Sequence, residues 1–186
     1  SAVLSLSRRL NAALPLLATG APTLPSAASL VVVAVESSGA WLARRPLDTV
    51  CGLKMSAANA SLVPTQASPL ESNLCELAWR PLTAQAEALK LMLPWPSHPS
   101  ERLAVGECEL PVVEAGECHG VAVWVDFDFA LVGQEAPSMK LSTGPPPKGC
   151  APTGWAQGLQ LLEEPLRVRP ESGDVLTVSV ELSSAS

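Results

Sequence analysis

The clearest structural signal in this sequence lies in residues 121–131, which read VAVWVDFDFAL. Apolar residues occupy every second position: Val121, Val123, Val125, Phe127, Phe129 and Leu131. The residues between them include Trp124, Asp126 and Asp128. This period of two predicts a β-strand with one apolar face. The alternating Asp residues favour a solvent-exposed second face, although two carboxylates on one face can also serve acid–base chemistry.

Shorter apolar segments elsewhere predict further strands. Residues 30–35 form a continuous apolar run, which is typical of a strand that is buried on both faces. The other predicted strands are residues 88–93, 103–113, 159–162 and 175–182. Pro and Gly separate them, with a turn expected at Gly173 and a loop over 144–152. Residues 41–72 show no regular period, so we expect an irregular segment with one helical turn. Glu163 and Glu164 are expected to form the charged end of a strand.

The N-terminal residues differ from the rest of the chain. Apolar residues recur every three or four positions over 2–18, which predicts a helix that ends near Pro15 or Gly20. The chain begins with Ser and shows no signal peptide, so we expect a piece of a longer protein or a processed product. The predicted architecture is a helix followed by an antiparallel β-sandwich or β-barrel.

Composition limits the classes of function. The chain has 186 residues, about one domain, and a formal net charge of −6, which argues against a direct nucleic-acid binder. No apolar run reaches the length of a membrane-spanning helix, so no membrane partner is expected. The five cysteines form no C-x-x-C pair, which indicates reduced thiols in a cytoplasmic or nuclear protein.

The residues themselves predict no complete catalytic or metal site. His98 lies between prolines and is expected to be solvated. His119 follows Cys118, and a metal site there would need further ligands such as Cys108 and Cys150. A buried thiol beside a hydrogen-bonded histidine is the simpler interpretation.

The C-terminal third resembles the protein arginine methyltransferases. Residues 118–129 read CHGVAVWVDFDF and resemble a barrel strand of that family. Residues 141–145 resemble its Ser-Thr-Gly stretch, and residues 153–155 stand in the place of its Thr-His-Trp loop. Residues 157–166 resemble the strand that follows this loop. The order and spacing of these pieces agree with the family.

Upstream pieces extend the resemblance. Residues 24–30 resemble the family's crossover into its barrel, and the helix before them resembles the last helix of the Rossmann-like methyltransferase core. The chain is most similar to the second module of the tandem type III, monomethylating enzyme. The resemblance therefore implies a truncated core over 1–25 and a β-barrel domain over 26–186. Residues 43–60 stand where the family inserts its dimerisation arm.

The resemblance implies methyl transfer from S-adenosylmethionine to an arginine guanidinium in the full-length enzyme. The family's glycine-rich cofactor loop and its two substrate-gripping glutamates would lie before Ser1, so this fragment is expected to bind no cofactor alone and to hold no catalytic residue. Thr153 and Trp155 are implied as substrate-binding residues, although Trp155 could instead fill the core. Gly154 stands in place of the family's His, which fits an inactive second module.

The resemblance also implies partners. Leu47, Val50, Leu53 and Met55 are expected to contact a second module, in a pseudo-dimer or homodimer, unless they pack on their own barrel. The other expected partners are the upstream methyltransferase half and arginine-containing protein substrates. The alternative is a standalone β-sandwich that binds a partner or has a structural role without catalysis.

Overall fold

A computed structural model describes residues 24–44, 47–59, 70–93, 102–130, 139–146 and 154–183. The predicted helix over 2–18 lies outside the described residues, as do His98, Cys150 and Thr153. The strands are β1 (Ala27–Glu36), β2 (Thr49–Val50), β3 (Leu53–Lys54), β4 (Leu70–Ser72), β5 (Arg80–Pro81), β6 (Ala86–Met92), β7 (Arg102–Pro111), β8 (Gly116–Phe129), β9 (Met139–Ser142), β10 (Gln157–Val168) and β11 (Val175–Ser183). The helices are α2 (Ser38–Leu42), α3 (Ser56–Asn59) and the 3-10 turns η2 (Leu74–Glu76) and η3 (Pro170–Ser172).

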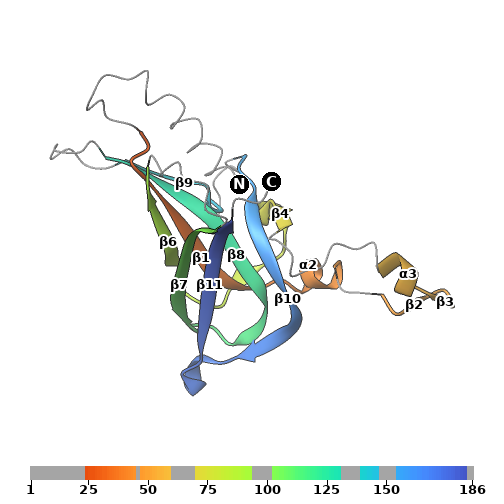
Figure 1. The fold of residues 1–186 in the computed structure, drawn as a ribbon. Helices are drawn as coiled ribbons and strands as arrows, with labels where there is room; N and C mark the ends of the chain where they lie inside the picture. Colours follow the sequence, from red (N-terminus) through yellow and green to blue (C-terminus); the bar gives the residue numbers. More distant parts are fainter. Residues whose placement is uncertain are drawn as a thin grey trace.

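The larger sheet is antiparallel and centred on β1. Its strand order is β4-β10-β8-β1-β5, with β6 also paired to β1 and β9 paired to β8. A second sheet consists of β7 and β11, which lie across the larger sheet in Figure 1. The predicted mainly antiparallel β fold is therefore confirmed for the described part of the chain.

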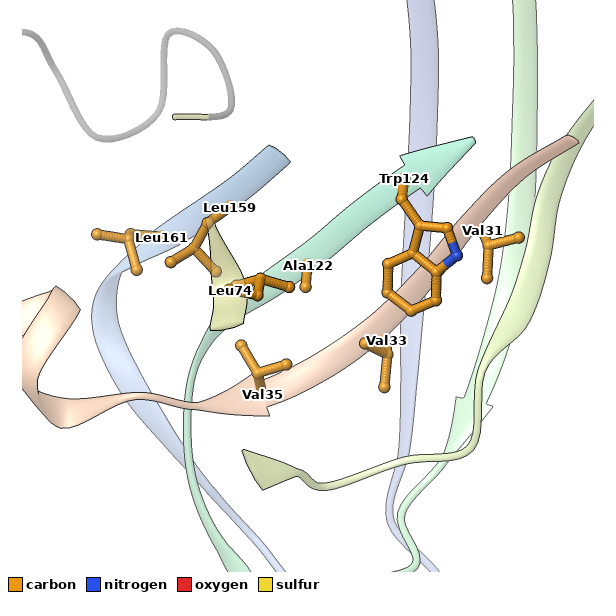
Figure 2. Packing of buried hydrophobic residues seen from close by; sticks show 8 residues of the cluster. All are labelled: Val31, Val33, Val35, Leu74, Ala122, Trp124, Leu159 and Leu161. Atoms are coloured by element: carbon orange, nitrogen blue, oxygen red, sulfur yellow. The ribbon is translucent and has the colours of Figure 1, made fainter. Parts of the chain in front are cut away.

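Strand β1 forms the core of the molecule. It is buried from Ala27 to Val35, which confirms the strand predicted over 30–35. Its odd-numbered valines point into one cluster, which Figure 2 shows; that cluster comprises Val31, Val33, Val35, Leu74, Ala122, Trp124, Leu159 and Leu161. Its even-numbered residues Val32 and Ala34 join a second cluster with side chains of β7, β10 and β11. Burial of one such valine contributes about 1.5–3 kcal/mol to folding.

Strand β8 begins at Gly116, five residues before the predicted start at residue 121. The prediction of a solvent-exposed face that includes Trp124 is wrong, because Trp124 is 4% exposed and belongs to the same buried cluster as Val31 and Leu74. The residues around η2 cover this part of the face, so both faces of β8 carry apolar packing.

The end of that face is polar, as predicted. Asp126 accepts a hydrogen bond from the Ser142 hydroxyl at 2.5 Å. Asp128 pairs with Lys90 at 3.3 Å and Lys140 at 3.8 Å. These half-buried carboxylates are thus engaged by the neighbouring strands β6 and β9, and their ion pairs contribute about 0–1 kcal/mol each.

Strand β10 continues well beyond the predicted 159–162. Its pairing with β8 shifts between Leu161 and Leu166, and the exposed Glu163 and Glu164 lie in this irregular stretch. The prediction that these glutamates mark a strand end is wrong, because a bulge lets the strand pass Pro165, which has no N–H to donate to the ladder. The predicted strand over 175–182 is confirmed as β11.

Residues 41–72 hold more structure than predicted. Strands β2 and β3 form a hairpin around Cys51 and Gly52, which both have positive φ, at 51° and 81°. Such a two-residue turn matches the twist of a hairpin. Asn59, at the end of α3, closes this arm because its side chain bonds both the N–H of Leu47 at 3.0 Å and its carbonyl at 2.6 Å. Figure 1 shows the arm extending away from the sheet.

The predicted strands over 88–93 and 103–113 are confirmed as β6 and β7. Within the described ranges, the helices are all too short or too polar to span a membrane.

Candidate functional site

The stretch that follows β9 is fixed to β8 through Thr143. The Thr143 hydroxyl donates to the carbonyl of Val125 at 2.9 Å and accepts from its N–H at 3.0 Å. The backbone N–H of Thr143 also donates to the Val125 carbonyl, at 2.9 Å. Thr143 is buried, so these bonds satisfy polar groups that water does not reach. The side chain of Thr143 therefore holds the chain against β8 where β9 ends.

Ser142 and Gly144, which flank Thr143, also contact the end of β8. The Ser142 hydroxyl, which donates to Asp126, also accepts the N–H of Gly144 at 3.1 Å. A Cβ on Gly144 would lie 2.6 Å from Nε1 of the buried Trp124 indole. Only glycine lets the backbone pass this close to the ring. The Ser-Thr-Gly stretch is thus explained by the packing of the end of β8.

Gln157 connects this stretch to two other segments. It is the first residue of β10, and its side chain is 2% exposed. Its Oε1 accepts from the N–H of Leu74 at 3.0 Å. Its Nε2 donates to the carbonyl of Thr143 at 2.8 Å and to that of Trp155 at 2.7 Å. The residue pattern did not single out Gln157; the one available signal is a polar side chain at the start of an apolar strand.

Trp155 lies on the segment just before β10. Gly154 precedes it with a φ of 73°, a left-handed conformation that favours glycine. The Trp155 side chain is 48% exposed, which contradicts the alternative that it fills the core. Its backbone carbonyl accepts from the same Gln157 amide nitrogen as the carbonyl of Thr143, so the backbones of Trp155 and Thr143 lie close together. Thr153, the other predicted substrate-binding residue, lies outside the described part of the chain.

The predicted hydrogen-bonded histidine is confirmed at His119. Its Nδ1 accepts the backbone N–H of Ser37 at 3.3 Å, and its ring lies 5.9 Å from that of Trp41. The neighbouring Cys118 is buried, and burial raises the pKa of its thiol, against smaller opposing effects of backbone hydrogen bonds. A thiol that stays protonated is a poor nucleophile. Within the described ranges, no group of three or more His, Cys, Asp or Glu residues is placed to hold a metal ion.

The predicted contact residues of the arm lie at its surface. Leu47 is 42%, Val50 41% and Leu53 69% exposed, and Met55 is half-buried. All of them belong to the β2–β3 hairpin or flank it. Three exposed apolar side chains on one small arm form a surface that does not pack on the sheet. We call Leu47, Val50, Leu53 and Met55 the arm patch.

The described residues do not fit the site that S-adenosylmethionine needs. Such a site uses a glycine-rich turn that leads from a strand into a helix, where backbone N–H groups face the ligand. Strand β1 does lead into α2, but through Ser37, and α2 has only five residues. The Ser37 hydroxyl donates to the carbonyl of Ala78 at 3.0 Å, and its N–H to His119. These groups hold the fold together and are not directed at a ligand.

Part of the chain is similar in sequence to curated proteins. No family model matches the chain. It is 38% identical to protein arginine N-methyltransferase 1.6 of Arabidopsis thaliana over 84 residues, which is 44% of this chain and 10% of that protein. It is 37% identical over 65 residues, 35% of this chain and 8% of the relative, to protein arginine N-methyltransferase 7 of Oryza sativa subsp. japonica. The same protein of Oryza sativa subsp. indica matches equally.

A solved structure shows the same fold. It is the Trypanosoma brucei PRMT1 enzyme–prozyme heterotetrameric complex with AdoHcy, which matches with a TM-score of 0.62 and 19% identity over 83% of this chain and 45% of that chain. The sequence matches show homology to protein arginine N-methyltransferases. The matched stretches span a tenth or less of the curated relatives.

Proposed function

We propose that this chain is the C-terminal barrel portion of a protein arginine methyltransferase, which transfers a methyl group from S-adenosylmethionine to an arginine guanidinium. Homology to that family and the shared fold support this proposal. The observation that carries it is the half-exposed Trp155, whose backbone carbonyl Gln157 bonds together with that of Thr143.

In this proposal Trp155, together with Thr153, forms part of the wall that receives the substrate arginine. The face of an indole attracts a guanidinium through its negative π-face, with a contribution of about 0.5–2 kcal/mol. The exposed half of the ring leaves room for that contact. Gly154 contributes no side chain to the wall, so the indole of Trp155 would supply the contact with the guanidinium.

S-adenosylmethionine belongs to the upstream half of the longer protein in this proposal. The described residues of this chain would supply no group to that cofactor, and the fragment would be inactive alone. The carboxylates that orient the substrate guanidinium would also come from the upstream half. This chain's contribution is to bind and orient the substrate from one side and to exclude water there.

The arm patch would contact a second module, either within the same chain or in a partner. The Trypanosoma brucei neighbour is described as an enzyme–prozyme heterotetramer, in which a second subunit accompanies the enzyme. A comparable pairing here would cover the exposed Leu47, Val50 and Leu53. The tandem type III enzyme, with two modules in one chain, is the arrangement we favour. The free thiols of the described cysteines fit a cytoplasmic or nuclear location.

Steady-state kinetics of the full-length protein test whether Trp155 contacts the substrate arginine. The variants Trp155→Ala and Trp155→Phe are compared with the wild type on an arginine-containing peptide. Trp155→Ala is expected to raise KM for the peptide by about 2- to 30-fold, which corresponds to the cation–π contribution, and Trp155→Phe by less. Val175→Ala, at an equally exposed apolar residue of β11, is the control. An unchanged KM in Trp155→Ala would contradict the wall, and binding of a partner without methyl transfer would favour the standalone module.

A further inference from the structure

The side chain of Gln157 bonds two segments that are remote in sequence and also the segment that immediately precedes its own strand. They are η2 with Leu74, the end of β9 with Thr143, and the segment with Trp155. Gln157 is 2% exposed, so water does not compete for these bonds. We infer that Gln157 is a positioning residue, which fixes the Trp155 segment to the two rigid segments and thereby sets the place of the indole. Only the purpose of this positioning, to place the indole for the substrate arginine, rests on the proposed function.

Two of the three partners are already fixed without Gln157. Leu74 is fully buried in the cluster of Figure 2, and η2 is capped by Asn73, whose side chain accepts the N–H of Cys75. Thr143 is held by its bonds to both backbone groups of Val125. These two segments therefore provide a fixed frame.

The Trp155 segment has less support of its own. Residues 154–156 belong to no strand or helix and are exposed. The Trp155 ring is nearly half exposed, so core packing alone does not determine its place. The bond from Gln157 Nε2 to the Trp155 carbonyl, at 2.7 Å, ties this segment to the fixed frame.

The chemistry of the three partners requires a carboxamide. Leu74 presents an N–H and needs an acceptor, whereas the carbonyls of Thr143 and Trp155 need donors. A glutamine side chain supplies one acceptor oxygen and two N–H donors, and only one orientation of the amide matches all three partners. A glutamate would keep the acceptor but face both carbonyls with an oxygen. A methionine of similar length would supply neither group.

Fluorine NMR of the 186-residue chain labelled with 5-fluorotryptophan tests the positioning. The chain has five tryptophans, and the Trp155 signal is assigned by Trp155→Phe. In Gln157→Met and Gln157→Glu we expect the Trp155 signal to broaden or split, while the signals of Trp41 and Trp79 stay unchanged. Val33→Ala removes core packing without touching the three bonds and should leave the Trp155 signal narrow. An unchanged Trp155 signal in both Gln157 variants, or equal broadening in Val33→Ala, would overturn the inference.

A measurement on the unaltered chain covers the case in which the Gln157 variants fail to fold. The side-chain amide hydrogens of Gln157 should exchange with solvent at least about 100-fold more slowly than those of the exposed Gln85. Equal exchange rates would overturn the inference. Neither readout involves methyl transfer, so a Trp155→Ala variant that binds arginine peptide normally would contradict the proposed function and leave the positioning intact.

Discussion

Gly144 and Trp124 are packed so closely that a Cβ on Gly144 would lie 2.6 Å from Nε1 of the indole. Trp124 is buried, and its ring lies beside Val31 and Val33 in Figure 2, so it has little room to move. This contact joins the Ser-Thr-Gly stretch to the main core. It explains by packing alone why a glycine follows Thr143, without any role in binding.

Gly144→Ala is therefore expected to destabilise the chain. Overpacking against a buried ring costs about 1–3 kcal/mol, which thermal or urea unfolding measures as a lower free energy of unfolding. Gly39→Ala is the matched control, because a Cβ there would meet no atom within 4 Å and the residue lies in α2. The control should be neutral or slightly stabilising. Equal stability of both variants would contradict the described contact.

Substitution of Gly154 tests its left-handed backbone. A Cβ there meets no atom within 4 Å, so any loss of stability comes from the φ of 73°. We expect losses that rise from Gly154→Asn to Gly154→His to Gly154→Val, with about 1 kcal/mol for His. Chemical unfolding of the three variants gives this ranking. If all three matched the wild type, the segment would not have this conformation, and the missing histidine of the Thr-His-Trp loop would need another explanation.

The arm patch is tested by hydrogen–deuterium exchange of residues 47–59. In the full-length protein, backbone amides of this arm should exchange more slowly than in the 186-residue chain, because a second module covers them. The double variant Leu53→Asp, Met55→Asp should abolish this difference, since charged side chains oppose burial at an apolar interface. Thr49→Asp, at an exposed polar residue of the same hairpin, should preserve it. A difference that survives the double variant would show that the patch makes no such contact.

The buried thiol of Cys118 should lower the free energy of unfolding at alkaline pH. Burial raises the pKa of its thiol in the folded chain above the value of 9.0 that it starts from. Folding therefore favours the protonated thiol: its contribution is fully present below pH 9.0 and is lost as the pH rises from there through the folded-state pKa. The slope is at most about 1.4 kcal/mol per pH unit.

Cys118→Ala should remove this part of the pH dependence. The measurement is the free energy of unfolding of wild type and variant between pH 7 and pH 10, because subtraction cancels the other groups that titrate in this range. Cys75→Ala, at an exposed cysteine, is the control and should keep the wild-type slope. An identical slope in Cys118→Ala and wild type would contradict the raised pKa.

The strands could be predicted from the sequence where one signal dominates. The apolar run over 30–35 follows from burial on two faces, and the alternation after residue 120 predicted the strand β8 although both of its faces carry apolar packing. The burial of Trp124 could not be predicted, because its cluster is built from β1 and η2, about 90 and 50 residues earlier in the chain. The bulge at Pro165 depends on pairing with β8, which local propensity does not encode.

Some residues of the candidate site could also be predicted from the sequence, whereas others required the structure. Trp155 could be named from the resemblance, and its exposure agrees with a surface role. The role of Gln157 could not be recognised from the residue pattern, because two of its three partners, Leu74 and Thr143, come from segments that meet it only in the folded chain. The arm residues were located by their position in the family pattern, whereas the closure of the arm by Asn59 required the structure.

The most direct test of the proposed function is methyl transfer by the full-length protein. The protein is incubated with S-adenosylmethionine that carries a carbon-13 methyl group and with an arginine-containing peptide, and the peptide is analysed by mass spectrometry. The proposal predicts that labelled methylarginine forms. At a subsaturating peptide concentration, it should form more slowly with the Trp155→Ala variant than with the Val175→Ala variant. Absence of labelled methylarginine, or formation that is independent of Trp155, would contradict it.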